Sequence, residues 1–202
     1  MRRRWGDTPA LLVVDVSRRC ADPDVSSPAV IRAVDQIAEL LAVARELDVP
    51  RLFTNGGKRY YTSGGADLTA DERGPWPLTT PIRDEDAATA RAALELAPQL
   101  GRRADEPLVT KRTPSAFFDS PLEGHLDALG TDTLVVTGVM TSCCVRATVQ
   151  DAFAHEYPVV LPRECVADRR PAAHGYHLHE MDAQFADVVD RAAVEDYLHA
   201  VA

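Results

Sequence analysis

The stretch TDTLVVTGVMTSCCVRATVQDAF, residues 131–153, decides the fold. Its first part, TLVVTG at 133–138, is a continuous apolar run of strand length, which is typical of a strand covered on both faces. Its second part belongs to a helix predicted at 142–156. A buried strand followed at once by a helix is the repeating unit of a parallel α/β sheet, and Cys143 and Cys144 stand side by side at the junction.

The same alternation of strand and helix extends in both directions along the chain. Strands are predicted at 10–17, 50–54, 107–110, 133–138, 158–162 and 187–190, and helices at 28–47, 88–96, 120–130, 142–156, 171–186 and 191–201. We therefore expect one α/β domain over residues 1–202. It is a Rossmann-like three-layer sandwich with a mainly parallel six-stranded sheet, order 3-2-1-4-5-6, and helices on both faces. Residues 55–83 are rich in Gly, Pro and Thr, and loops of that length are usually functional lids.

Composition narrows the classes of partner. The 202 residues include 22 basic and 31 acidic ones, a net charge of −9, which argues against nucleic acid or an anionic membrane as a partner. The basic start MRRRWG is not followed by the apolar core of a signal peptide, and no apolar run approaches the ~20 residues of a membrane span. The four cysteines show neither metal-type nor disulfide-framework spacing. We expect a cytoplasmic protein that acts on a small molecule.

Three chemically capable residues come at the ends of three predicted strands. Asp15 ends the first, Lys111 follows the third, and Cys144 opens the helix after the fourth. In a parallel sheet these strand ends share one edge. A helix N-terminus favours a thiolate, a neighbouring carboxylate can take the thiol proton, and an ammonium can hold the ionised cluster together.

Each of the three residues also has an ordinary structural explanation. Asp15 could cap a turn, Lys111 could be a solvated surface lysine, and Cys144 could be a small buried apolar residue. Lysine is rare here, since 20 of the 22 basic residues are arginine and only Lys58 and Lys111 are lysine. That bias gives modest support to a specific need for an ammonium at position 111.

Longer motifs resemble a known family. The stretches LLVVDV, DP at 22–23, VTKRTPSAFFDSPLEGHLDALGTDTLVVTGVMTSCCVRATVQDAF, and PRECVADR followed by AAH are similar to the isochorismatase-like cysteine hydrolases. Within that superfamily they most resemble the N-carbamoylsarcosine amidohydrolase group. The similarity spans nearly the whole chain.

The resemblance implies roles for individual residues. The family's nucleophile follows a G-x-x-T-x-x-C spacing, which here selects Cys144 after Gly138 and leaves Cys143 at a variable position. Asp15 matches the family's general base and Lys111 its lysine.

The resemblance also implies a cis peptide bond at Val139–Met140. That bond would turn the backbone amides of Met140 and Cys144 toward one point as an oxyanion hole.

Substrate contacts are predicted at five positions. Arg169 matches a residue that grips a substrate carboxylate in the carbamoylsarcosine group, and a guanidinium suits that task. Cys20 replaces an aromatic residue that usually walls the pocket. The other three are Asn55, Phe117 and Thr141; Asn55 could equally belong to a turn. On the late helix, His174, His177 and His179 are read as surface or interface residues.

No metal and no organic cofactor are expected. Nicotinamidases of the superfamily carry an Asp/His metal cluster after the second strand, whereas FTNGGKRYYTSGG, residues 53–65, contains neither residue type. The expected assembly is a homodimer or homotetramer.

Three functions remain open at this stage. The leading one is hydrolysis of a C–N bond in a small amide or N-carbamoyl compound through a cysteine acyl-enzyme, with release of ammonia. The second is vinyl-ether hydrolysis of the isochorismatase type, although isochorismatases proper lack the cysteine. The third is a non-catalytic redox or carrier-protein-binding module that uses the Cys143–Cys144 pair, which lacks the C-x-x-C geometry of disulfide exchange.

Overall fold

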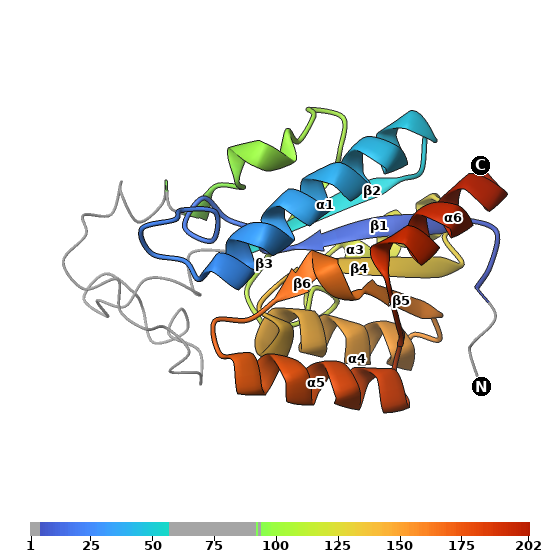
Figure 1. Ribbon diagram of the computed structural model, residues 1–202. Helices are drawn as coiled ribbons and strands as arrows, with labels where there is room; N and C mark the ends of the chain where they lie inside the picture. Colours follow the sequence, from blue (N-terminus) through green and yellow to red (C-terminus); the bar gives the residue numbers. More distant parts are fainter. Residues whose placement is uncertain (1–4, 57–91, 93) are drawn as a thin grey trace.

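A parallel sheet runs through the centre of the molecule, with helices on both faces (Figure 1). The computed structural model describes residues 5–56, 92 and 94–202. The strands are β1 Pro9–Val14, β2 Arg51–Gly56, β3 Leu108–Lys111, β4 Thr133–Val139, β5 Val159–Pro162, β6 Val166–Ala167 and β7 Asp187–Val189. Their order is β3-β2-β1-β4-β5-β7, and β6 pairs with β4. The predicted order of six strands is confirmed; the two-residue β6 was missed.

Helices cover the two faces unequally. They are α1 Pro28–Glu46, α3 Leu122–Ala128, α4 Arg146–Ala154, α5 Pro171–Gln184 and α6 Arg191–Val201. One apolar core lies between the sheet and α1 with α6, and the other lies between the sheet and α3, α4 and α5. The predicted three-layer sandwich is therefore confirmed. Within the described part of the chain, no helix combines the length and the apolar character that a membrane span requires.

Two boundaries near the strand ends differ from prediction. The first strand ends at Val14 and not at Ser17, because Asp15 has a φ of +53° that breaks the extended backbone. The helix predicted from residue 142 starts with a π-helical turn, Thr141–Val145, before α4 begins at Arg146. The predicted lid at 55–83 and helix at 88–96 lie mostly outside the described residues.

Gly138 lets the two central strands approach each other closely. It pairs with Val14 across β1 and β4 and has a φ of +120°. A Cβ on Gly138 would lie 2.1 Å from the Val14 carbonyl oxygen and 2.7 Å from the Val14 nitrogen. Both atoms belong to backbone in the middle of the sheet, so neither can move aside cheaply. Glycine is needed here for backbone conformation and for space.

We predict that Gly138→Ala lowers the free energy of unfolding by roughly 2–5 kcal/mol, the sum of left-handed backbone strain and overpacking. Urea unfolding measures the change. Gly175→Ala in α5 is the control, because nothing lies within 4 Å of its added Cβ; it should gain up to about 1 kcal/mol. Equal stability of the two alanine variants would contradict the explanation.

A buried carboxylate ties α1 and β2 to the loop before β3. Glu106 is 2% exposed and accepts from Arg45 Nε at 2.8 Å and from Arg51 Nε at 3.1 Å. The Arg103 amide donates to it at 2.8 Å. Burial alone would raise the pKa of Glu106, but these donors and charges outweigh it and lower the pKa to about 2.

We predict that Glu106→Gln destabilises the fold by about 3 kcal/mol at pH 7, because it leaves two guanidinium groups without their carboxylate. The folded pKa lies below the unfolded one, so this contribution is present above about pH 4.5 and is lost as the pH falls toward 2. Urea unfolding of the wild type and of Glu106→Gln should show a smaller difference in the free energy of unfolding at pH 3 than at pH 7. Glu46→Gln, at an exposed position, is the matched control. If the difference between wild type and Glu106→Gln were the same at pH 3 as at pH 7, the stabilising role of the ionised Glu106 would be contradicted.

Candidate active site

Lys111 is the last residue of β3 and is fully buried. The strand alternates exposed and buried residues, so Lys111 points to the same face as Val109, toward α3 and α4. On the neighbouring strand, Gly56 stands at the register position beside it. A glycine there leaves no side chain between the lysine and the next strand, β1.

Asp15 meets Lys111 at the carboxyl edge of the sheet. Its Oδ2 lies 2.6 Å from Lys111 Nζ, with only 4% of the Asp15 side chain exposed. Thr54 donates its hydroxyl to Asp15 Oδ1 at 2.7 Å. Asp15 has a φ of +53°, a region that Asp enters more readily than most residues. A strained, buried carboxylate with a fixed partner on each oxygen is typical of a functional site.

Cys144 completes the cluster from the π-helical turn. It is 6% exposed and packs in the same apolar core as Val109. Lys111 forms an ion pair with Asp15 and donates to the Thr113 carbonyl at 3.0 Å, and its charge also interacts with Cys144. The Cys144 thiol also donates to Cys143 Sγ at 3.9 Å. The three residues predicted from strand ends are therefore brought together.

The cluster shifts the pKa values of Cys144 and Lys111. The hydrogen bond to Cys143, burial and the charge of Asp15 raise the pKa of the Cys144 thiol well above its usual value, and Lys111 offsets them only in part. Burial would lower the pKa of Lys111, but Asp15 and Cys144 raise it above its usual value. These effects oppose the stabilisation of a thiolate that is expected at a helix N-terminus. Cys144 needs a base.

The backbone around the nucleophile combines an unusual peptide bond with hydrogen bonds that shape the turn. The Val139–Met140 peptide bond is cis, as the resemblance implied. The amides of Cys143 and Val145 both donate to the Met140 carbonyl, at 3.0 and 3.3 Å, and the Ser142 amide donates to a carboxylate. The amides of Met140 and Cys144, the predicted pair, belong to the same segment, and their role as an oxyanion hole stays a prediction.

Several residues that hold this site were missed by sequence reasoning. Asp168, after β6, accepts from the Ser142 amide at 2.9 Å and from its hydroxyl at 2.5 Å. His174 Nδ1 lies 2.9 Å from Thr141 Oγ1, a contact that the interpretation of His174 as a surface or interface residue did not include. Thr54 was also missed. The sequence offered two signals for these residues: Asp168 is a carboxylate within ECVADR, and Thr54 is the last residue of the predicted second strand.

Two predicted contact residues lie within the apolar cores. Phe117 is 7% exposed and stacks on His155 with ring centroids 4.9 Å apart, in the core that contains Cys144. Cys20 is also 7% exposed, but it belongs to the core under α1, where its thiol lies 3.9 Å from the Asp15 carbonyl. Their contact with substrate stays a prediction.

The other predicted contact residues lie at the carboxyl edge. Asn55 Oδ1 accepts from Thr110 Oγ1 at 2.8 Å, one residue before Lys111. Thr141 is fully buried at the start of the π-helical turn. Arg169 is exposed in the loop between β6 and α5. Among the described residues, no group of three or more His, Cys, Asp or Glu side chains is placed to hold a metal ion.

Comparison with known proteins gives a consistent result. The isochorismatase domain model matches residues 9–193. Maleamate amidohydrolase of Pseudomonas putida is 34% identical over 189 residues, which cover 93% of this chain and 85% of that protein. N-carbamoylsarcosine amidase of an Arthrobacter species is 29% identical over 201 residues, which cover 98% of this chain and 74% of that protein.

Solved structures show the same fold. A cysteine hydrolase from Pseudomonas syringae pv. phaseolicola 1448A has a TM-score of 0.80 at 22% identity, covering 98% of this chain and 97% of that one. N-carbamoylsarcosine amidase from Thermoplasma acidophilum has a TM-score of 0.69 at 21% identity, covering 91% and 96%. With the domain model matching nearly the whole chain, the protein belongs to the isochorismatase family.

Proposed function

We propose that the protein is a cysteine-dependent hydrolase that cleaves a C–N bond of a small amide or N-carbamoyl compound and releases ammonia. The observation that carries this proposal is the buried contact of Asp15, Lys111 and Cys144, which puts a nucleophile, a base and a cation in one cluster. The relatives named maleamate amidohydrolase and N-carbamoylsarcosine amidase support C–N bond cleavage over vinyl-ether hydrolysis.

The first half of the reaction forms an acyl-enzyme. Asp15 takes the proton of the Cys144 thiol, and the thiolate attacks the carbonyl carbon of the substrate. Negative charge develops on the carbonyl oxygen, which the amides of Met140 and Cys144 stabilise. Protonated Asp15 then gives its proton to the departing nitrogen, ammonia leaves, and the acyl group stays on sulfur as a thioester or thiocarbamate.

The second half returns the enzyme to its resting state. Asp15 takes a proton from water, and the hydroxide attacks the acyl carbon. The carbon–sulfur bond breaks, Cys144 recovers its proton through Asp15, and the product leaves as an acid, or as carbon dioxide and an amine from a carbamoyl substrate. Lys111 keeps its charge throughout and balances whichever of Asp15 and Cys144 is negative.

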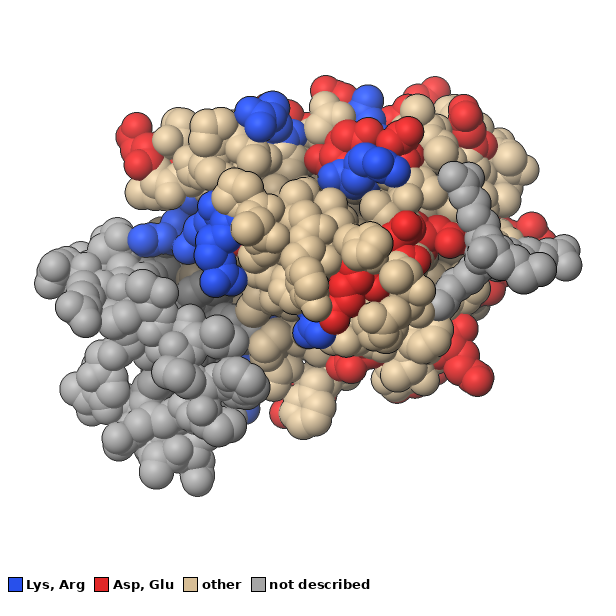
Figure 2. Space-filling view, turned by 60° about the horizontal axis from the view of Figure 1, so that its bottom comes forward, with Lys and Arg blue, Asp and Glu red and all other residues tan. Residues whose placement is uncertain are grey.

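The substrate is proposed to carry a carboxylate, bound by Arg169. Figure 2 shows basic side chains gathered beside the larger of the two grey regions, while acidic side chains are scattered over the rest of the face in view. In Figure 1 the strand arrows point to the end of the molecule beside this region. Arg169 and Arg170 follow β6 there. An arginine-rich rim on a protein of net charge −9 favours an anionic substrate.

The activity is tested by ammonia release over carbamoyl amino acids, maleamate-like half-amides and ureido acids. Turnover that is insensitive to EDTA, with an acyl adduct on Cys144 after rapid quench, is the expected result. Turnover that requires an added metal, or hydrolysis of a vinyl ether with no amide turned over, would overturn the proposal. An Arg169→Ala variant that turns over carboxylate substrates at full rate would overturn only the arginine assignment.

We predict that Cys144→Ala and Cys144→Ser abolish turnover, because neither side chain supplies a thiolate. Cys143→Ala should keep most of it. Loss of the hydrogen bond to Cys143 should also lower the pKa of Cys144, so iodoacetamide should alkylate the variant faster than wild type at neutral pH. Peptide mass mapping identifies the labelled cysteine. Equal loss of turnover in folded Cys143→Ala and Cys144→Ala would refute the choice of nucleophile.

We predict that Asp15→Asn slows acylation by roughly 10²–10⁴-fold with little change in substrate binding, because it removes the base. Lys111→Arg should also be inactive, since a planar guanidinium does not fit a fully buried ammonium site 2.6 Å from the carboxylate. Arg112→Lys, at the exposed next residue, is the matched control and should stay active. Single-turnover kinetics measure each step; an active Lys111→Arg enzyme would show that only the charge matters.

A further inference from the structure

We propose that Asp168 and His174 are positioning residues that hold the nucleophile turn, Thr141–Val145, in the shape that aims its backbone amides at the substrate oxyanion. The inference rests on the proposed function, because it assigns a purpose to residues that do not belong to the cluster of Asp15, Lys111 and Cys144.

Two hydrogen bonds attach Asp168 to the turn, and a third ties its side chain to its own loop. Its side chain is 3% exposed. Oδ2 accepts from the Ser142 amide at 2.9 Å and from the Ser142 hydroxyl at 2.5 Å, and Oδ1 accepts from the Arg170 amide at 3.0 Å. The Arg170 guanidinium is 4.0 Å away and 76% exposed, so it compensates the buried charge only weakly. The hydrogen bonds therefore hold the carboxylate, and they lower its pKa although burial would raise it.

The short strand β6 explains why this carboxylate reaches the turn. Val166 and Ala167 pair with Gly138 and Val139 of β4. Asp168 is the next residue, level with Met140, where β4 gives way to the turn. Its partner Ser142 lies midway between Met140 and Cys144, the two residues whose amides are proposed to bind the oxyanion. Fixing the Ser142 amide fixes the backbone between them.

His174 holds the first residue of the same turn from α5. Its Nδ1 lies 2.9 Å from the hydroxyl of Thr141, which is fully buried. Six residues further along α5, Glu180 binds Arg146 of α4 at 2.7 Å. Helix α5 is thus attached to both ends of the segment that carries the nucleophile.

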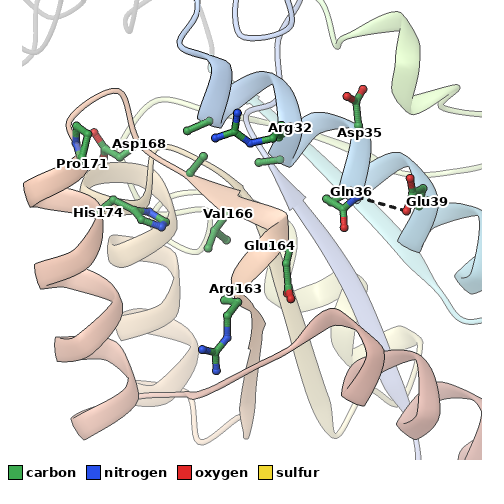
Figure 3. Close-up of a pocket in the computed structure, with 13 residues that line it drawn as sticks. Arg32, Asp35, Gln36, Glu39, Arg163, Glu164, Val166, Asp168, Pro171 and His174 are labelled. Carbon is green, nitrogen blue, oxygen red and sulfur yellow. Dashed lines mark hydrogen bonds between the residues drawn. The ribbon is translucent and has the colours of Figure 1, made fainter.

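The two residues face a cavity that is separate from the catalytic cluster. It has a volume of about 570 Å³ and lies between α1 and the β6–α5 segment, with Asp168 and His174 among its lining residues (Figure 3). Asp15, Lys111 and Cys144 do not line it. Asp168 and His174 therefore approach the turn from outside the cluster, as expected of residues that shape a site without touching the reacting atoms.

Two probes separate positioning of the amides from reactivity of the thiol. Acylation by 4-nitrophenyl acetate passes through an oxyanion, whereas alkylation by iodoacetamide uses the same thiol and forms none. For Asp168→Asn, whose amide cannot accept all three hydrogen bonds, we expect acylation to fall roughly 10- to 100-fold. Alkylation of Cys144 should stay at the wild-type rate. His174→Ala should also slow acylation, by a smaller factor, and leave the alkylation rate unchanged.

Milder and matched variants keep the test decisive if Asp168→Asn does not fold. Ser142→Ala removes the hydroxyl that donates to Asp168 and accepts from Arg170 Nη2 at 3.3 Å, and it should slow acylation, while Ser142→Thr retains a hydroxyl and should keep acylation near the wild-type rate. Asp187→Asn is the control for loss of a buried carboxylate. Asp187 accepts from Trp5 Nε1 at 2.7 Å and lies at the start of β7, away from the carboxyl edge that carries the catalytic cluster. His179→Ala, on the exposed face of the same helix, is the control for His174. Neither control should change acylation.

The outcomes distinguish this inference from the proposed function. Unchanged acylation in folded Asp168→Asn or Ser142→Ala, or an equal fall in acylation and alkylation, would overturn the positioning role and leave the hydrolase proposal standing. A wild-type protein that is neither acylated nor alkylated at Cys144 would overturn both. A selective fall in acylation that Ser142→Thr does not show would establish the positioning role.

Discussion

The contact between Asp15 and Lys111 constrains the rest of the structure. A lysine with no exposed surface is tolerable only beside a countercharge, and here the carboxylate lies 2.6 Å away. Bringing the two together requires β3, β2 and β1 to end at one edge, with Gly56 leaving room between them. The thiol of Cys144 is then added from the next strand. The sheet order, Gly56 and the buried charge pair together bring Asp15, Lys111 and Cys144 into one cluster.

Sequence patterns were sufficient for the architecture. Buried parallel strands are continuous apolar runs, and helices between them fix the connections, so the order of six strands could be predicted before any coordinates. The exceptions are informative. Strand β6 has only two residues, which is too few to show a periodic pattern of apolar residues. The left-handed backbone at Asp15 ends β1 early, and no residue pattern in DVSRRC signals it.

The site was predictable to the extent that its residues come directly after long strands. Asp15, Lys111 and Cys144 do so, and the resemblance assigned the nucleophile between two adjacent cysteines. The contacts of Asp168 and His174 with the turn were not predicted, because they depend on the pairing of the short strand β6 with β4. The resting state of the thiol also could not be predicted, since it depends on burial and on a hydrogen bond that only three-dimensional packing creates.

The fully enclosed cluster of one carboxylate, one ammonium and one thiol has a further consequence. It is electroneutral at rest, and it is equally electroneutral after the proton has moved from sulfur to carboxylate. The proposed nucleophile can therefore be generated without any change in the total charge that the protein interior must accommodate. With none of the Lys111 side chain and 4% of the Asp15 side chain exposed, a proton exchanged between two fixed neighbours activates the thiol without placing a new net charge in the interior.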